Sequence, residues 1–322
     1  MTFQARSSGK IILLGEHAVV YGCPAIAAGI SKGARARAHR SEVASLTLPI
    51  NLDLTRQRDV DQAFAGLLAA LGSGPVEVHA ECEIPPGIGL GASAALGVAI
   101  ARAVLGANAQ ETCSQGSNRA NDVDVSTQIH RAAQAWETVF HGRPSGIDVA
   151  AAALGGCFEF TKDGGPKPLR LGEPLVIAVA LAGPAVSTKT MVDGVARLRE
   201  RSPELVDRSI QSIRSLVQDA KVALETADLE VLGHLLDTNQ RLLAGLFLST
   251  PAIEHACLMA RNAGALGAKL TGKGGGGGVI ALCREDAEPV LDAWRKDGIE
   301  CFSSLILPSG VVASSSNDSP RC

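Results

Sequence analysis

The chain has 322 residues, of which 46% are hydrophobic, so it can bury a sizeable core in one large domain or, as we expect, in two medium ones. The net charge is −3, and no block of Lys or Arg occurs along the chain, which argues against nucleic acid or a membrane surface as the partner. Aromatic residues make up 3%, which argues against base-stacking platforms and leaves a small, diffusible ligand as the expected partner.

The first half of the chain alternates between strand and helix patterns. Residues 76–84 alternate apolar and polar with period two, which predicts a strand with one solvated face. Shorter strands are expected at 11–14 and 34–39, and helices at 60–71, 92–107 and 121–140. At 161–174 the composition shifts to Gly, Pro and charge, which predicts a link between two domains.

The second half begins with an apolar strand at 175–182. Further strands are expected at 268–271, 279–283 and 301–307, and helices at 188–200, 203–225, 228–247, 251–264 and 285–297. This order predicts α+β layers rather than a regular βαβα series. The small, polar residues 313–322 predict a disordered tail.

The cysteines and the lengths of the apolar runs indicate where in the cell the protein is expected. The eight cysteines show neither a CxxC pair nor a Cys/His spacing typical of zinc, so we expect reduced thiols that fill the core. The apolar run near the N-terminus has only four residues, and we expect no stretch of the chain to approach the ~20 apolar residues of a membrane span. These features predict a cytoplasmic protein.

The segment PPGIGLGASAA, residues 85–95, combines glycines with the start of a predicted helix. A loop that ends at the positive end of a helix dipole presents backbone N–H groups to an anion, and phosphate is the usual one. Ser93 in the first turn could cap the helix or bind a phosphate oxygen or Mg²⁺. The alternative is that the glycines only permit a tight turn and that Ser93 is only a cap.

The segment KLTGKGGGGG, residues 269–278, nearly matches a P-loop. Gly274 occupies the position where a P-loop needs Ser or Thr for Mg²⁺, and a strand-like segment follows instead of a helix. A flexible linker is the simplest alternative. The position between two predicted apolar strands favours a tight loop of close backbone approach.

The segment ETVFHGRPSGID, residues 137–148, supplies two carboxylates at the end of a helix and in a glycine-containing loop. Glu137 and Asp148 could serve as a metal ligand and a proton acceptor. Acidic residues at helix ends are also common on protein surfaces, so both interpretations stay open at this point. His141 is expected to be structural.

Residues 8–27, 85–95 and 267–278, in this order, resemble the three motifs of the GHMP kinase family, which is named after galactokinase, homoserine kinase, mevalonate kinase and phosphomevalonate kinase. Within the family, GKIILLGEHAVVYG, HGRPSGID and STKTMVDGV are most similar to the mevalonate kinases. The resemblance implies an α+β fold with a domain like ribosomal protein S5 domain 2 over 1–168 and a ferredoxin-like domain over 169–312. It also implies ATP-dependent phosphorylation of the mevalonate 5-hydroxyl in the isoprenoid pathway, and a homodimer.

The resemblance assigns roles to individual residues. ATP phosphates would bind along Pro85, Gly87, Gly89, Leu90, Gly91, Ala92, Ser93 and Ala94, with Gly274; Lys273 joins this set only by the separate hypothesis given below. Mg²⁺ would be held by Ser93 and Glu137. Asp148 would accept the proton beside Lys10, and the substrate would contact Lys10, Glu16, His17, Asp148, Thr188 and Gly272. Adenine contacts are expected within 46–62.

Three positions depart from the family pattern. Ala92 replaces the first of two serines, Val149 replaces an asparagine, and Lys273 replaces a small residue. We hypothesise that Lys273 reaches the phosphates or an anionic group of the substrate; the alternative is a solvated loop lysine. His17 could likewise be a structural histidine, and Thr188 could simply cap the following helix.

Two alternative functions remain on sequence grounds. The first keeps the fold and changes the substrate to phosphomevalonate or another small hydroxy compound. The second is a non-catalytic sensor that binds ATP and a metabolite, since a fold can persist without its chemistry. The presence of Lys10, Ser93, Glu137 and Asp148 argues against the sensor. The family resemblance implies that homoserine kinases lack the aspartate at the position of Asp148, so Asp148 with Lys10 argues against that member of the family.

Overall fold

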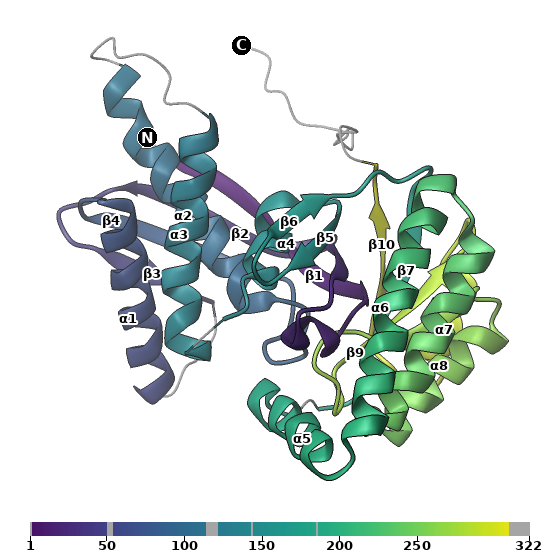
Figure 1. Ribbon diagram of the computed structural model, residues 1–322. Helices are drawn as coiled ribbons and strands as arrows, with labels where there is room; N and C mark the ends of the chain where they lie inside the picture. The colour runs from purple at the N-terminus through teal and green to yellow at the C-terminus, as the bar shows by residue number, and fades with distance from the viewer. Residues whose placement is uncertain (1, 50–53, 114–121, 143, 185, 309–322) are drawn as a thin grey trace.

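Two β-sheets with flanking helices form the two halves of the protein (Figure 1). The computed structural model describes residues 2–49, 54–113, 122–142, 144–184 and 186–308. The strands of the first sheet all precede residue 169, and those of the second begin at Leu175. The predicted tail, 313–322, lies outside the described residues.

The first sheet has six strands in the order β3-β4-β2-β5-β6, with β1 paired to β2. The strands are β1 (Phe3–Leu14), β2 (Ala25–Arg40), β3 (Ser45–Thr47), β4 (Val76–Cys82), β5 (Cys157–Thr161) and β6 (Gly165–Pro168). β1 and β2 are much longer than expected. In β2 the reason is that small alanines rather than large apolar residues fill the buried face. Ala34, Ala36 and Ala38 are buried there. The strand predicted at 76–84 is confirmed.

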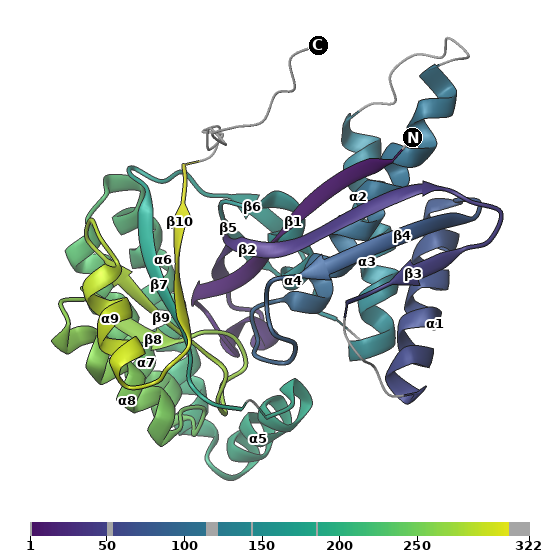
Figure 2. The same cartoon turned by 180° about the vertical axis from the view of Figure 1, so that it is seen from behind.

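Helices cover one face of this sheet, as the opposite views in Figures 1 and 2 show. They are α1 (Leu54–Leu71), α2 (Ala92–Cys113), α3 (Asp122–His141) and α4 (Ile147–Leu154), and a short 3-10 helix, η1 (Ala18–Tyr21), follows β1. The three helices predicted in this half are confirmed, whereas α4 and η1 were not expected. α4 is only two turns long, which is too short for a clear periodic pattern.

α2 corrects one expectation about apolar runs. Within the described part of the chain, residues 92–109 form one window that is long and apolar enough to cross a membrane by length and composition. In the structure 56% of this window is buried inside the protein. α2 packs on β1, β2 and α3, which is the position of a core helix.

The second sheet is antiparallel in the order β10-β7-β9-β8. Its strands are β7 (Leu175–Leu181), β8 (Gly267–Leu270), β9 (Gly278–Cys283) and β10 (Cys301–Ile306). Its helices are α5 (Thr188–Arg201), α6 (Pro203–Thr226), α7 (Leu229–Gly245), α8 (Pro251–Asn262) and α9 (Glu288–Lys296). With its helical connections, this strand order is ferredoxin-like, as expected. The predicted elements of this half are confirmed to within a few residues.

The predicted link at 161–174 is too long. Its first part closes a hairpin in which β5 pairs antiparallel with β6, from Phe158 opposite Pro168 to Thr161 opposite Gly165. Asp-Gly and Gly-Gly sequences favour tight hairpin turns, and the same composition is typical of linkers. Only residues 169–174 connect the two sheets.

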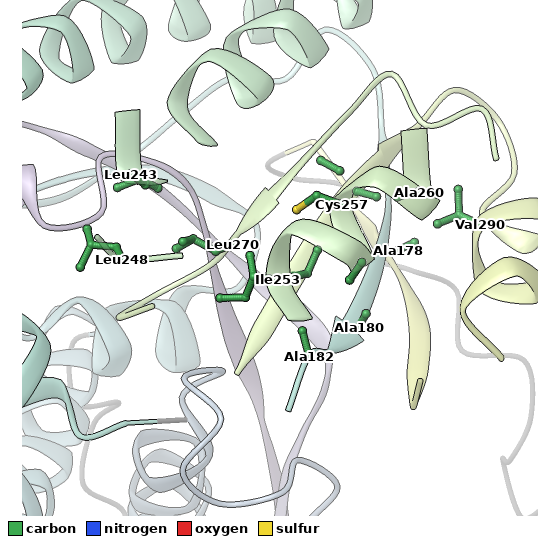
Figure 3. Packing of buried hydrophobic residues seen from close by; sticks show 14 of the residues in the cluster. Ala178, Ala180, Ala182, Leu243, Leu248, Ile253, Cys257, Ala260, Leu270 and Val290 are labelled. Atoms are coloured by element: carbon green, nitrogen blue, oxygen red, sulfur yellow. The ribbon is translucent and has the colours of Figure 1, made fainter. Parts of the chain in front are cut away.

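The two halves share a hydrophobic core. Ile11 and Leu13 of β1 belong to the same buried cluster as Ile177 of β7 and Val217 of α6. A second cluster lies mainly in the second half, where Leu243, Leu248, Ile253, Cys257 and Leu270 pack together (Figure 3), and it also includes Ala18 and Cys23 of the first half. The six cysteines whose side chains are described are free, and four of these are buried, as expected for core filler.

Phe247 follows α7 in a conformation that suits glycine better. Its φ is 59°, and its side chain is 75% exposed. A left-handed conformation costs an L-residue about 1–2 kcal/mol, and glycine offsets part of this gain by losing about 0.5–1 kcal/mol of chain entropy. We therefore expect Phe247→Gly to raise the unfolding temperature by about 1–3 °C in a thermal melt. Phe247→Ala removes the ring but keeps Cβ and is the control; a lower melting temperature for the glycine variant than for the alanine variant contradicts the expectation.

Candidate active site

Lys10, within β1, forms an ion pair with Asp148 of α4. The Lys10 side chain is 6% exposed, and its Nζ lies 3.0 Å from Asp148 Oδ1. Nζ also donates to Gly89 O at 3.2 Å, and the Lys10 backbone N–H donates to Leu90 O at 2.8 Å. Lys10 therefore links β1 both to Asp148 and to the glycine-containing loop at residues 85–91, which is called the glycine loop below.

Asp148 lies in the first turn of α4, which begins after Gly146 with a φ of 87°. The expectation of a plain glycine loop at this position is therefore wrong, since a short helix starts there. A carboxylate near a helix N-terminus is stabilised by the helix dipole. The Asp148 side chain is 35% exposed, so solvent or a ligand can reach it.

The loop at 85–91 leads directly into α2, which begins at Ala92 as predicted. Gly87, Gly89 and Gly91 have φ values of 83°, 85° and 76°. A Cβ atom on Gly91 would lie 3.2 Å from Lys10 Cβ and 3.5 Å from Asp148 Oδ1. These glycines therefore provide both the left-handed turns and the close approach to the ion pair.

Ser93 and Glu137 meet beside this loop. Ser93 Oγ donates to Glu137 Oε1 at 2.5 Å, and Glu137 is 3% exposed on α3. Burial raises the pKa of Glu137 to about 7, and the hydrogen bond from Ser93 partly opposes this shift. Ser93 is therefore more than a helix cap, because its hydroxyl is paired with a buried carboxyl group.

Close packing of α2 against α3 places Ser93 next to Glu137. A Cβ atom on Gly97 would lie 2.8 Å from Trp136 Cδ1, so only glycine lets the indole approach this closely. Trp136 Nε1 donates to Ser93 O at 3.1 Å. The residue before Glu137 thus holds the backbone of Ser93 in place.

His141 lies one helical turn after Glu137, with its Nε2 3.6 Å from Glu137 Oε2. Burial lowers the pKa of His141, which favours the neutral ring at neutral pH. The i, i+4 spacing from Glu137 was the sequence signal for this neighbour.

Glu16 is held inside the protein. Its carboxylate forms an ion pair with Lys269 of β8 and accepts a hydrogen bond from Asn239 Nδ2 at 3.1 Å. Both charged side chains are fully buried, and such a pair persists only when its hydrogen bonds are satisfied. Substrate binding by Glu16 stays a prediction.

His17 follows with a φ of 59°, and its Nε2 lies 2.8 Å from Lys273 O. Burial lowers the pKa of His17. The residue is thus tied to the third glycine-rich segment, and its contact with substrate stays a prediction.

The third segment is a tight loop of close approach, as expected, and β9 follows it instead of the helix of a P-loop. A Cβ atom on Gly272 would lie 3.1 Å from Gly89 O, and one on Gly274 would lie 2.4 Å from Leu248 O. Lys273 Nζ donates to Gly87 O at 2.9 Å. The two glycine-rich loops are therefore in direct contact.

Thr188 is the first residue of α5, and its side chain is exposed. The suggestion that Thr188 caps this helix is wrong, because Ser187 is the N-cap and its Oγ accepts from Thr190 N at 3.1 Å. The chain before α5 contacts the third segment, since Val186 N donates to Gly275 O at 3.2 Å. The substrate role of Thr188 stays a prediction.

The Ser93–Glu137 pair fits a hard divalent cation. Within the described residues, no group of three or more His, Cys, Asp or Glu is arranged to hold a metal ion. Mg²⁺ does not need such a group, because it binds through one or two protein oxygens and leaves the rest of its octahedron to water and phosphate. The hydroxyl of Ser93, in the first turn of α2, and the neighbouring carboxylate of Glu137, on α3, provide such a donor set. Burial penalises the negative charge of Glu137, and a bound cation would offset that penalty.

Comparisons with known proteins agree with this arrangement. The models of the GHMP kinases N terminal domain and of the GHMP kinases C terminal region match residues 60–156 and 220–300. The chain is 31% identical to mevalonate kinase of Methanothermobacter thermautotrophicus over 92% of this chain and 95% of that protein. It is 35% identical to mevalonate kinase of Thermococcus onnurineus over 91% of this chain and 92% of that protein.

A solved structure has the same fold. The crystal structure of L. major mevalonate kinase in complex with R-mevalonate superposes with a TM-score of 0.82 and 27% identity, over 96% of this chain and 97% of that one. The mevalonate kinase of Methanococcus jannaschii gives a TM-score of 0.76 at 22% identity, which supports the fold. The sequence motifs, the two sheets and these matches lead to one conclusion: the chain belongs to the GHMP kinase family.

Proposed function

We propose that the protein is a mevalonate kinase, which transfers the terminal phosphoryl group of ATP to the 5-hydroxyl of mevalonate. The observation that carries the proposal is the Lys10–Asp148 pair, which lies at the glycine loop beside Ser93 and Glu137. The relatives named mevalonate kinase, and the L. major structure with R-mevalonate, support this substrate. The family match alone indicates an ATP-dependent kinase.

The ion pair supplies the acceptor chemistry. As the substrate oxygen bonds to phosphorus and ADP leaves, the hydroxyl proton passes to a carboxylate oxygen of Asp148. Lys10 holds this carboxylate at 3.0 Å and balances its charge next to the incoming phosphate. The enzyme's main task is therefore to position the two substrates and neutralise charge.

The glycine loop and the oxygen pair supply the donor side. Backbone N–H groups at the start of α2 would bind the phosphates of ATP. Ser93 and Glu137 would hold Mg²⁺, which neutralises charge on the phosphate oxygens when it is bound. A cytoplasmic location and a homodimer are part of the same proposal.

A coupled assay of ADP release tests the proposal with mevalonate, phosphomevalonate, galactose and homoserine as acceptors. We expect kcat/KM for mevalonate to exceed that for each other compound by at least about 100-fold, because a site built for the polar groups of one substrate rejects others. Faster turnover of phosphomevalonate would support the related-substrate alternative. If ATP raises the unfolding temperature of the protein but no acceptor leads to ADP release, the result would support the non-catalytic sensor.

A further inference from the structure

Lys273 connects three segments of the candidate site. Its backbone carbonyl lies 2.8 Å from His17 Nε2, and its Nζ donates to Gly87 O at 2.9 Å. Its two glycine neighbours pack against other backbone, at Gly89 O and Leu248 O. The backbone on both sides of Lys273 is therefore held in place, and the side chain reaches the glycine loop at Gly87.

Two lysines border this loop in the same manner. Lys10 Nζ donates to Gly89 O at 3.2 Å, and Lys273 Nζ donates to Gly87 O at 2.9 Å. The carbonyls of Gly87 and Gly89 thus each accept a hydrogen bond from a lysine ammonium group. Both ammonium groups therefore lie on the loop that leads into the N-terminus of α2. Lys273 belongs to the third segment, and its ammonium group is the one that this segment places on the loop, because the segment's other lysine, Lys269, is paired with Glu16.

The surroundings of Lys273 differ from those of a solvated surface lysine. Its side chain is half-buried, and burial followed by the positive charge of Lys10 lowers the pKa of Lys273. The negative charge of Asp148 acts in the opposite direction and raises the pKa of Lys273. Lys10, Lys273, Asp148 and His141 are therefore close enough to influence one another electrostatically.

We propose that Lys273 is a polyphosphate ligand, whose ammonium group exchanges its hydrogen bond to Gly87 O for one to the outer phosphates of ATP. A phosphate oxygen is charged and accepts a stronger hydrogen bond than a neutral carbonyl, so the exchange favours nucleotide binding. Lys273 and Lys10 then flank the polyphosphate on the Gly87 and Gly89 sides of the loop. This inference deepens the proposed function and rests on it for the identity of the nucleotide.

Isothermal titration of ATP, ADP and AMP with Mg²⁺ tests the inference without any acceptor. We expect Lys273→Met to weaken ATP binding about 10–100-fold, because one charge-assisted hydrogen bond is lost, and to leave AMP binding within about twofold. Lys273→Arg keeps the charge and should restore most of the ATP affinity. Lys296→Met, at an exposed lysine of α9, is the matched control and should bind ATP like the wild type.

The AMP arm separates a phosphate contact from a general loss of structure, because a collapsed loop would weaken AMP as well. Unchanged ATP affinity in Lys273→Met overturns the inference, and a raised KM for mevalonate alone would instead assign the lysine to an anionic group of the substrate. Failure of the proposed function is a separate result. If the wild type does not turn over mevalonate but Lys273→Met still loses ATP affinity, the lysine assignment stands and the acceptor is wrong.

Discussion

Replacement of Asp148 by asparagine is expected to lower kcat for mevalonate about 100- to 10,000-fold, the usual contribution of a general base. Asparagine has nearly the same size but cannot accept the hydroxyl proton, and it removes the negative charge opposite Lys10. The side chain is 35% exposed, so we expect only a small change in stability. Steady-state kinetics at saturating ATP and Mg²⁺ measure the effect.

The control for this variant is Asp163→Asn, at an exposed aspartate between β5 and β6. It should leave kcat unchanged. Asp148→Asn should also keep its affinity for ADP, which shows that the glycine loop is intact. A kcat for Asp148→Asn within tenfold of the wild type would contradict a role in proton transfer.

Glu137→Gln is expected to raise the Mg²⁺ concentration needed for half-maximal activity at least about tenfold, since loss of even an indirect metal partner costs 10–100-fold in affinity. Glutamine has the same length but no charge for a cation. Because burial already raises the pKa of Glu137 to about 7, a neutral side chain should fold without a large loss of stability. The measurement is a Mg²⁺ titration of activity, with Mn²⁺ binding in the presence of ADP followed by EPR.

Ser93→Ala should act in the same direction, because it removes the second oxygen donor. Glu204→Gln, at an exposed glutamate at the start of α6, is the matched control for charge loss. If the Mg²⁺ requirement of Glu137→Gln equals that of the wild type, Glu137 is not a metal ligand. Its burial beside Ser93 would then serve only the packing of α2 against α3.

Local patterns predicted most of the fold. The ferredoxin-like half follows from apolar strands and from helices whose patterns stand out in the sequence, such as α8, predicted at 251–264. The glycine loop at 85–91 and the helix start after it were predicted because glycines, a strand end and a helix start are adjacent in the sequence. The extent of β2 was missed because alternating Ala and Arg residues carry a weak hydrophobic signal. The β5–β6 hairpin was missed because its turn has the composition of a linker.

The candidate site was predicted in part. The sequence placed Ser93, Glu137, Asp148 and Lys10 in one site only through the family resemblance, because they come from separate elements. Lys269 was overlooked, although a lysine between apolar residues in a strand needs a buried partner. That partner, Glu16, lies 253 residues away in the sequence, and only the folded chain brings the residues after β1 next to Lys269 of β8.

The central claim is that this site transfers a phosphoryl group from ATP to the primary hydroxyl of mevalonate. The most direct test is to incubate the protein with ATP, Mg²⁺ and R-mevalonate and to identify the product by ³¹P and ¹³C NMR. We predict a phosphate ester at carbon 5, formed in equal amount to ADP. A phosphate ester at another oxygen, or ADP accompanied only by inorganic phosphate, would contradict the account.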